Sequence, residues 1–340
     1  MIKVAVVGAT GYAGEELIKI LLRHPSCKIT YICAKIEGPK KFSDIFNWAK
    51  GKLDLVCDNP DMSKFDAVDI VFLALPHKAS MGIAPLILEK RKIVIDLSAD
   101  YRLKDTAEYE KWYGVKQSDQ ENLKKAVYGL PEFYRKEIKA AKLIANPGCY
   151  PTAAILAIAP LLKKKLCEAK NIIIDTKSGY SGAGRKEPND PFWKAIKDNF
   201  KAYKVDAHQH SPEINQELSN AAGEKIKATF VPHLLPIERG ILETIYLKVK
   251  SQKSKVKNLI EFYKDFYKDA AFVRIKNEDE FPQLSDVRNT NFCDIGVKVN
   301  QESGLIIIIS CIDNLVKGVA GQAVQNMNII CGFKETEGLL

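Results

Sequence analysis

The stretch KVAVVGATGYAGEEL (residues 3–17) decides the fold of this chain. Residues 3–8 are apolar and largely β-branched, which predicts a buried strand, and residues 15–24 form an amphipathic helix that ends before Pro25. Three glycines between them permit a tight turn, a close approach of backbone N–H groups to a pyrophosphate, and close helix–strand packing. We therefore expect a dinucleotide-binding turn, formed by Gly8, Thr10, Gly11, Tyr12 and Gly14.

The first half of the chain repeats this alternation of strand and helix. Such alternation is typical of a doubly wound, Rossmann-type parallel sheet. The expected strands are 3–8, 28–34, 69–75, 92–98 and 142–146, with helices at 15–24 and 81–90.

The second half has longer strands with alternating faces and fewer helices between them. This pattern favours an α+β domain with a largely antiparallel sheet. The expected strands are 171–179, 227–235, 240–250 and 304–313, with helices at 151–165, 254–268 and 318–330. The last helix is rich in Gly and Ala on one face, so we expect it to pack back on the first domain. The predicted domains are residues 1–148 with 314–340, for the dinucleotide, and 149–313, for catalysis and dimerisation.

Length and composition exclude several classes of protein. At ~150 residues a domain, 340 residues suit two domains. The fractions of hydrophobic residues (46%) and charged residues (27%) are those of globular proteins, which excludes disordered and fibrous chains. No apolar run approaches the length of a membrane span, and the N-terminus lacks the basic region of a signal peptide. We expect a cytoplasmic protein without a membrane partner.

The net charge and the cysteines bear on the ligands and metals that the protein could bind. With 51 basic against 42 acidic residues, the net charge of +9 favours anionic ligands. The lysines are dispersed, however, so we expect no nucleic-acid partner. Eight cysteines show no C-x-x-C pair and no zinc spacing, which predicts reduced, mostly buried thiols and no metal site.

The end of the second strand bears on the choice of cofactor. NAD sites usually place an acidic residue there, which binds the ribose 2′-hydroxyl. Here the strand ends with Cys33 and Ala34 followed by Lys35, and no acid occurs until Glu37. A lysine suits a 2′-phosphate, so NADP is the expected cofactor. Short-chain dehydrogenases share part of the glycine motif, but they need a Tyr and a Lys four residues apart on one face of a helix. The two pairs with this spacing, Tyr31/Lys35 and Tyr246/Lys250, both fall in predicted strands, which argues against that class.

The segment NPGCYPT (146–152) contains the candidate nucleophile. Pro147 and Gly148 favour a sharp turn after a strand, and Pro151 suits the first turn of a helix. Cys149 therefore stands at a helix N-terminus, where the partial positive charge lowers a thiol pKa. The alternative is a buried structural cysteine.

Five histidines are available for proton transfer, and the pair in HQH (208–210) is the best placed. In an extended segment His208 and His210 project to the same face, next to the helix start at 211–213. We expect His210 to act as general acid or base, with a zinc pair or a helix cap as alternatives. His77 follows a strand at the edge where ligands collect, and His24 is expected to be structural.

An anionic substrate needs positive charge or N–H donors. The candidates are Arg102, Arg185 and the backbone of Ser178 and Gly179, although each also suits a surface or a flexible loop. A nicotinamide site with a nucleophilic Cys and a His predicts an oxidoreductase that holds its substrate as a thioester.

Nearly the whole chain resembles one family, the N-acetyl-gamma-glutamyl-phosphate reductases, which are related to aspartate-semialdehyde dehydrogenase. The motifs that carry the resemblance are GATGYAGEEL (8–17), LPH (75–77), DLSADYRL (96–103), YGLPE (128–132), NPGCYPT (146–152), SGAGR (181–185), HQHSPEINQEL (208–218), PHLLPIERGIL (232–242), TNFCDIGV (290–297) and DNLVKGVAGQAVQNMN (313–328).

The resemblance implies NADPH-dependent reduction of an acyl phosphate to a semialdehyde in arginine biosynthesis. It implies that Cys149 is the nucleophile, that His208 or His210 handles protons or the leaving phosphate, and that NADP lies along the glycine turn. Asn314 and Gln322 are implied to lie near the nicotinamide. In the matched motifs, the remaining candidates for substrate contacts are Asn146 and Glu213.

Departures from the family pattern are slight. Gln209 stands where the family often has Arg, and Lys78 where it often has Gly. The same chemistry on a carrier-protein-bound aminoadipyl or glutamyl phosphate is the nearest alternative, followed by a Cys–His hydrolase and a non-catalytic NADP sensor. The resemblance also implies a homodimer or homotetramer.

Overall fold

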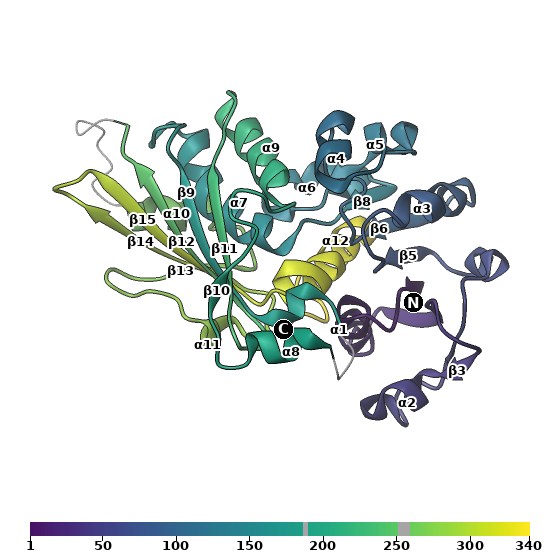
Figure 1. The fold of residues 1–340 in the computed structure, drawn as a ribbon. Coiled ribbons are helices and arrows are strands. Elements are labelled where there is room, and N and C mark those ends of the chain that lie inside the picture. The colour runs from purple at the N-terminus through teal and green to yellow at the C-terminus, as the bar shows by residue number, and fades with distance from the viewer. Residues whose placement is uncertain (186–189, 251–258) are drawn as a thin grey trace. The chain divides into compact units, whose positions relative to one another are not determined.

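A computed structural model describes residues 1–185, 190–250 and 259–340, which form two compact units (Figure 1). Unit 1 comprises residues 1–147 and 319–340, and unit 2 comprises residues 148–318. The C-terminal segment thus belongs to unit 1 only from residue 319, because residues 314–318 are part of unit 2.

Unit 1 is built on a six-stranded sheet in the order β2-β1-β5-β6-β8-β7, and all of its pairs are parallel. β1 is apolar on both faces, as expected of a strand that helices cover on both sides. The Rossmann-type fold predicted from the sequence is therefore confirmed. The strands are β1 Ile2–Val7, β2 Cys27–Cys33, β5 Ile70–Leu73, β6 Ile93–Asp96, β7 Val127–Tyr128 and β8 Leu143–Ala145.

The helices of unit 1 include four that the sequence did not indicate, α2, α4, α5 and α6. A small excursion between β2 and β5 carries a two-stranded sheet, β3 Lys40–Lys41 and β4 Val56–Cys57. The helices are α1 Tyr12–Leu21, α2 Phe42–Ile45, α3 Ser80–Glu89, α4 Thr106–Tyr113, α5 Gln120–Lys125, α6 Pro131–Ala140 and α12 Gly321–Cys331, with 3-10 turns at Asn47–Ala49 and Met62–Ala67.

α12 packs against α6 and α1, and its buried surface is more polar than its small residues suggest. Gln322 and Asn326 are fully buried, and their amide N–H groups donate to the Gly129 carbonyl oxygen at 2.7 and 2.8 Å. A Cβ on Gly129 would lie 2.5 Å from the Asn326 amide. The lack of a side chain at Gly129 therefore lets the amides of α12 reach the backbone.

Unit 2 is built on a seven-stranded sheet in the order β10-β11-β9-β12-β15-β14-β13. Its pairs are antiparallel except β9 with β11 and β13 with β14, which confirms the predicted, largely antiparallel sheet. The strands are β9 Ile173–Ser178, β10 Lys201–Ala202, β11 Thr229–Leu234, β12 Ile241–Lys248, β13 Val273–Ile275, β14 Cys293–Asn300 and β15 Leu305–Ile312.

One face of this sheet is covered by α7, which contacts β12, β14 and β15. α7 buries thirteen consecutive residues, from Tyr150 to Leu162. The helix predicted over 254–268 is described only as α10 from residue 259, and residues 254–258 lie outside the described part. The helices are α7 Cys149–Lys163, α8 Pro191–Ile196, α9 Ser211–Ala222, α10 Leu259–Phe266 and α11 Leu284–Val287, with a 3-10 turn at Tyr180–Ala183 and a π-helix at Val316–Ala320.

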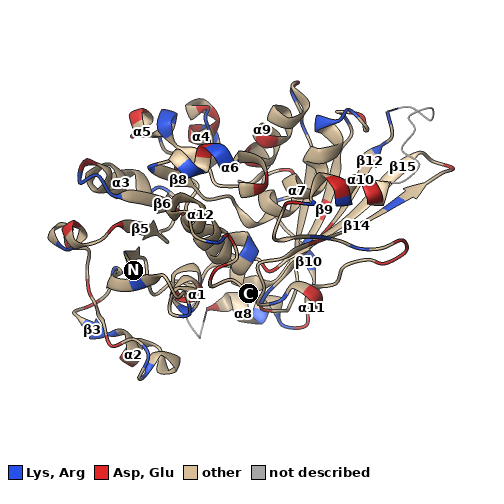
Figure 2. Cartoon of the chain, turned by 180° about the vertical axis from the view of Figure 1, so that it is seen from behind, with Lys and Arg blue, Asp and Glu red and all other residues tan. Residues whose placement is uncertain are grey.

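The surface charges are mixed in sign. Figure 2 shows basic and acidic residues interspersed on the helices and loops. In the described part of the chain, no helix has the length and apolar character needed to cross a membrane.

Candidate active site

The glycine turn of unit 1 has the geometry that the sequence predicts. Gly8 adopts a left-handed φ of 86°, and a Cβ there would lie 2.2 Å from the Ala74 carbonyl oxygen. A Cβ on Gly14 would lie 2.2 Å from the Gly8 oxygen, so both positions require glycine. Gly11 precedes α1, and a Cβ there would meet only the Gly8 oxygen, at 3.7 Å. The backbone at Gly11 is therefore open to a close ligand, as a dinucleotide diphosphate requires.

The cation predicted for the 2′-phosphate lies beside this turn. The N–H groups of Gly8 and Ala9 donate to the Cys33 carbonyl oxygen at 2.8 and 3.1 Å, which joins the turn to the end of β2. Lys35 follows two residues later and is exposed. It makes no ion pair with any residue that the structure describes, so its charge is available to a ligand.

In unit 2, Cys149 is the first residue of α7 and is half-buried. The preceding residue, Gly148, is extended, and its N–H donates to Glu213 Oε1 at 2.8 Å. The Gly148 carbonyl oxygen accepts from Thr152 Oγ1 at 2.8 Å. A Cβ on Gly318 would lie 2.8 Å from Cys149 Cβ. Glu213, Thr152 and Gly318 thus all contact residues 146–149, which carry the candidate nucleophile and are termed the nucleophile turn.

The HQH segment forms a turn rather than the extended strand considered from the sequence. α9 begins at Ser211, and His210 occupies its N-cap position with φ −81° and ψ −14°. The backbone N–H of His210 donates to His208 Nδ1 at 3.1 Å. Nδ1 of His208 is therefore an acceptor, and a neutral His208 ring carries its proton on Nε2. Although the segment is not extended, the two rings lie 4.9 Å apart.

Tyr150 brings the nucleophile turn and the histidines together. Its ring lies 5.3 Å from that of His208 and 5.6 Å from that of His210. Its hydroxyl forms a 2.7 Å hydrogen bond with the Tyr203 hydroxyl. Burial raises the pKa of Tyr203 to about 12 and that of Tyr150 well above its usual range. Both hydroxyls therefore stay protonated at neutral pH.

Two loops of unit 2 are fastened to each other next to the end of β9. Gly179 donates its N–H to the Gly240 oxygen at 2.9 Å, and a Cβ there would lie 2.6 Å from the Glu238 oxygen. Asn314 Oδ1 accepts from the Gly240 N–H at 2.7 Å, and its Nδ2 donates to Ser181 Oγ at 2.9 Å. The Asn314 amide thus holds these loops within unit 2.

The candidates in unit 1 are deeply buried. Arg102 donates through Nε to the Asn146 oxygen and through Nη2 to the Leu97 oxygen, both at 2.8 Å. Asn146 is fully buried and donates to the Val319 oxygen at 3.1 Å. The Arg102 bond thus holds the backbone at Asn146, which precedes the candidate nucleophile, and the Asn146 side chain holds the backbone at Val319. Gln322 Oε1 is a buried acceptor that has no hydrogen-bond partner among the described residues.

Other predicted residues are less informative. Ser178 Oγ donates to the Gly179 oxygen at 3.0 Å, and Arg185 is exposed beside residues outside the described part. His24 is buried, with Nε2 2.8 Å from Asn328 Oδ1. His77 is exposed, and its Nδ1 accepts from the Ala99 N–H at 3.0 Å. No group of three His, Cys, Asp or Glu side chains among the described residues is arranged to hold a metal ion.

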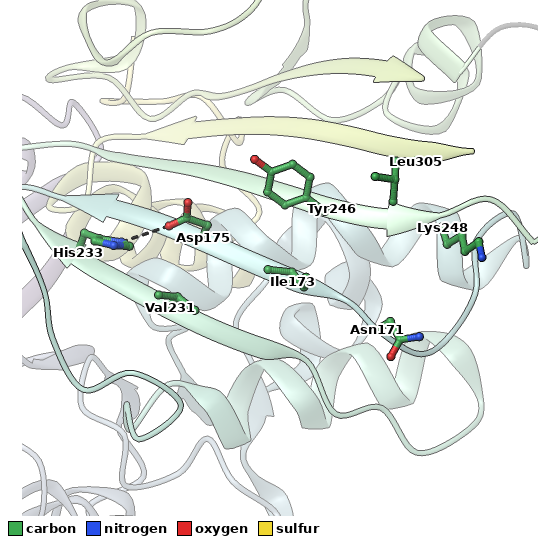
Figure 3. Close-up of a pocket in the computed structure, with 8 residues that line it drawn as sticks. All are labelled: Asn171, Ile173, Asp175, Val231, His233, Tyr246, Lys248 and Leu305. Carbon is green, nitrogen blue, oxygen red and sulfur yellow. Dashed lines mark ion pairs between the residues drawn. The ribbon is translucent and has the colours of Figure 1, made fainter. Parts of the chain in front are cut away.

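A hollow of about 650 Å³ occurs elsewhere, on the face of the unit 2 sheet that α7 does not cover (Figure 3). Figure 3 shows Ile173, Val231 and Tyr246 along this face, with an ion pair between Asp175 and His233 at one end. It contains neither Cys149 nor His210. The residues that line it are Asn171, Ile173, Asp175, Val231, His233, Tyr246, Lys248 and Leu305.

Two family models match the chain, one in each unit. Residues 3–141 match the family model described as the semialdehyde dehydrogenase NAD binding domain, and residues 149–314 match the semialdehyde dehydrogenase dimerisation domain. The glycine turn lies in the first match, and Cys149 is the first residue of the second. The dimerisation description indicates that the chain forms an oligomer.

Relatives that match over the full length of the chain identify the family more closely. A protein of Geotalea daltonii named N-acetyl-gamma-glutamyl-phosphate reductase is 49% identical, over 100% of this chain and 98% of its own. One of the same name from Pelotomaculum thermopropionicum is 48% identical, over 99% and 97%. The chain belongs to the N-acetyl-gamma-glutamyl-phosphate reductase family. The family resemblance seen in the sequence motifs is thereby confirmed.

Solved structures support the fold. Aspartate semialdehyde dehydrogenase II of Vibrio cholerae has a TM-score of 0.72 at 16% identity, over 98% of this chain and 99% of its own. The Candida albicans aspartate semialdehyde dehydrogenase, solved with NADP, has a TM-score of 0.72 at 17% identity, over 97% and 98%. A member of the reductase family therefore shares its two-unit architecture with these dehydrogenases.

Three residues next to the candidate nucleophile Cys149 were not singled out from the sequence. Tyr150 and Gly318 both lie in motifs that carried the resemblance, but nothing in those motifs indicates contact with the histidines or with Cys149. Tyr203 lies outside the quoted motifs, and its hydrogen bond joins residues 53 positions apart. The only sequence feature that could have indicated any of these three residues is the position of Tyr150 immediately after Cys149.

Proposed function

We propose that this chain reduces N-acetyl-gamma-glutamyl phosphate to N-acetylglutamate semialdehyde and phosphate, with NADPH as reductant, in arginine biosynthesis. The observation that supports this most is the nucleophile turn, where a half-buried Cys149 begins α7 and the N–H before it is fixed by Glu213. Relatives 46–49% identical over 99–100% of the chain carry the name of that reductase.

We assign the covalent step to Cys149. Its thiolate attacks the acyl carbon and expels phosphate, which leaves a thioester on Sγ. The oxyanion that forms in this attack lies beside the first turn of α7, where N–H groups have no partner within the helix. The tyrosine hydroxyls nearby stay neutral, so they add no negative charge next to the thiolate. Collapse of the reduced adduct returns the thiolate and releases the semialdehyde.

We assign proton transfer to His210 and a positioning role to His208. His208 Nδ1 is occupied by the His210 N–H, and its ring packs against Tyr150, Tyr203 and Phe230. These contacts fix His208 as part of the turn that carries His210. His210 stands at the N-cap of α9, one turn before Glu213, and thus beside the segment that holds Cys149.

The residues of unit 1 fit a nicotinamide dinucleotide. Gly8, Gly11 and Gly14 leave space for the diphosphate, with Thr10 and Tyr12 in the same turn, and Lys35 suits the 2′-phosphate. The buried Gln322 Oε1 suits a carboxamide N–H donor. When bound, the cofactor supplies the hydride. Asn314 is better explained as a positioning residue, because both ends of its amide are used within unit 2.

The experiment runs the reaction backwards, which avoids a labile acyl phosphate. Purified protein receives N-acetylglutamate semialdehyde, phosphate and NADP, and formation of NADPH is followed. We expect a rate that requires phosphate and disappears in Cys149→Ser, whereas the variant still binds NADP. Cys331→Ser is the matched control, because Cys331 is the other cysteine that is not fully buried. Activity in Cys149→Ser would show that Cys149 takes no part in the reaction. A wild type that binds NADP but is inactive would show that N-acetylglutamate semialdehyde is not its substrate.

The oligomer is proposed to be a homodimer formed through the open face of the unit 2 sheet. Successive residues of β9, β11 and β12 alternate between the helix-covered face and this face. Ile173 is 42% exposed there, and Tyr246 and Leu305 are half-buried around the hollow. An apolar sheet face of this kind is typical of a surface that a second subunit covers.

A further inference from the structure

The loop that follows β5 lies directly against the glycine turn. A Cβ on Gly8 would lie 2.2 Å from the Ala74 carbonyl oxygen, so the two segments are in backbone contact. Residues 76–79 of this loop are exposed. Since β1 pairs with β2 on one side and β5 on the other, residues that follow β2 and β5 flank the glycine turn. Lys35 stands on the β2 side and Lys78 on the β5 side.

A buried carboxylate fixes the conformation of this loop. Asp100 Oδ1 accepts from the Lys78 N–H at 2.6 Å, and Oδ2 accepts from the N–H groups of Ser80 and Met81 at 2.9 and 3.3 Å. Tyr109 donates its hydroxyl proton to Oδ1 at 2.8 Å. Asp100 is fully buried, so the loop is attached to the rigid interior of unit 1.

Lys78 is held in a conformation that lysine rarely adopts. Its φ is 79°, in the left-handed region where glycine is the ordinary residue. Its N–H is one of the Asp100 donors, so this carboxylate stabilises the strained backbone. The side chain is exposed and makes no ion pair with the described part of the chain. Lys165 and Lys204 also have a positive φ, but Lys78 combines this strain with a place at the edge of the sheet where ligands bind, which motivates a functional interpretation.

We propose that Lys78 binds the diphosphate of the nicotinamide cofactor and that Asp100 is its positioning residue. The inference rests on the proposed placement of the cofactor along the glycine turn. That turn offers backbone N–H groups, but residues 8–14 include no basic side chain. The diphosphate is bound at the turn itself, whereas the 2′-phosphate is bound past the second strand. Lys78 therefore complements the diphosphate, which NADPH and NADH share. Lys35 complements the 2′-phosphate, which only NADPH carries.

The test measures the dissociation constants of NADPH and NADH, without turnover, for the wild type and single variants. Lys78→Gln retains the backbone strain and removes the charge. We expect it to weaken both cofactors about tenfold, the value of one charged hydrogen bond. Lys35→Gln weakens NADPH alone. Lys78→Arg retains most of the affinity, and the loss in Lys78→Gln shrinks as salt is added.

Arg91→Gln is the matched control. Arg91 is also an exposed cation with a positive φ, 58°, but it precedes β6 and so lies at the opposite edge of the parallel sheet. Its substitution leaves both dissociation constants unchanged. Equal constants for Lys78→Gln and the wild type overturn the proposal. A loss confined to NADPH also overturns it, because Lys78 then contacts the 2′-phosphate.

A separate variant distinguishes failure of the cofactor site itself. At Gly11 a Cβ meets only one atom, at 3.7 Å, so Gly11→Val folds but fills the space that the diphosphate needs. Loss of both cofactors in Gly11→Val, with an unchanged Lys78→Gln, refutes the role of Lys78 alone. Normal binding by Gly11→Val refutes the placement of the cofactor and with it the proposed function.

The role of Asp100 is tested by a double-mutant cycle. If Asp100 acts through Lys78, Asp100→Asn weakens both cofactors in the wild type but not in a Lys78→Gln background. A merely structural role gives the same loss in both backgrounds and refutes positioning. Tyr109→Phe, which removes one donor from the carboxylate and leaves its charge, repeats the cycle if Asp100→Asn fails to fold.

Discussion

Gly318 limits the space around Cys149, the proposed nucleophile. Its missing side chain is what allows the π-helix Val316–Ala320 to lie against Cys149, because a Cβ there would be 2.8 Å from the Cys149 Cβ and 3.3 Å from its Cα. Real Cβ atoms do not approach one another so closely. Any larger residue at 318 must displace either the π-helix or the first turn of α7.

We therefore expect Gly318→Ala to lower kcat by roughly 10- to 100-fold, as small displacements of a reacting group do, while the fold is retained. The measurement is kcat together with the rate of Cys149 alkylation by iodoacetamide. Gly82→Ala is the control, because Gly82 lies within α3 with no atom within 4 Å of its added Cβ. That change stabilises the protein by up to ~1 kcal/mol. Full activity in Gly318→Ala contradicts the argument.

At the scale of elements, α9 fixes the start of α7 through one side chain. Glu213, in the first turn of α9, accepts the Gly148 N–H, and the two residues are 65 positions apart in the chain. The bond orients the turn that presents Cys149, so the two helices act together at the site.

Removal of that acceptor is expected to affect both stability and reactivity. Glu213→Ala leaves the buried Gly148 N–H without its partner and costs about 1–3 kcal/mol of unfolding free energy. It also slows alkylation of Cys149, whereas Glu213→Gln, which keeps an oxygen there, has a smaller effect. Glu217→Ala is the control, since Glu217 is equally buried on α9 but bonds to Gln216 and Asn220 of the same helix. Equal alkylation rates in Glu213→Ala and Glu217→Ala argue against the coupling.

The core strand β12 carries an acid, Glu243, for which the described residues supply no counter-ion. Glu243 is fully buried opposite Thr176 and Ser310, and its carboxyl oxygens have no hydrogen-bond partner among the described residues. Burial raises the pKa of Glu243 well above its usual value, with the Thr176 hydroxyl opposing the rise. The folded protein thus keeps a proton that the unfolded chain releases above about pH 4.5.

The sign of the resulting pH dependence follows from linkage. As pH rises from about 4.5 towards the folded pKa, the contribution of Glu243 to stability falls by about 1.4 kcal/mol per unit. We expect Glu243→Gln to lack this loss, so the unfolding free energy of the variant increases relative to that of the wild type as pH rises. Urea denaturation of both proteins at several pH values measures the difference. A constant difference from pH 5 to pH 8 means that Glu243 is not protonated in the fold.

At the scale of the whole molecule, the proposed homodimer interface on the open face of the unit 2 sheet makes a testable prediction. Ile173→Glu places a charge on that face and is expected to shift the protein to half its native mass in analytical ultracentrifugation. Leu86→Glu is the control, because Leu86 is similarly exposed, 45% against 42%, but lies on α3 of unit 1. An unchanged mass in Ile173→Glu places the interface elsewhere.

The sequence by itself determined the features that depend on neighbouring residues. The strand, turn and helix of residues 3–17, the turn before Cys149 and the absence of an acid at the end of β2 are all local, because backbone preference and glycine spacing act over a few residues. They sufficed for the fold class and the cofactor, whereas the family followed from the resemblance of motifs along nearly the whole chain.

Only the tertiary structure decided the contacts between distant segments. Glu213 at the Gly148 N–H, Gly318 against Cys149 and Asp100 beneath Lys78 join positions from 22 to 169 residues apart, and no periodic pattern encodes such pairs. The HQH segment became a turn because α9 begins immediately after it. The amides of α12 are buried because Gly129 leaves room for them, and burial is a property of packing rather than of any one residue.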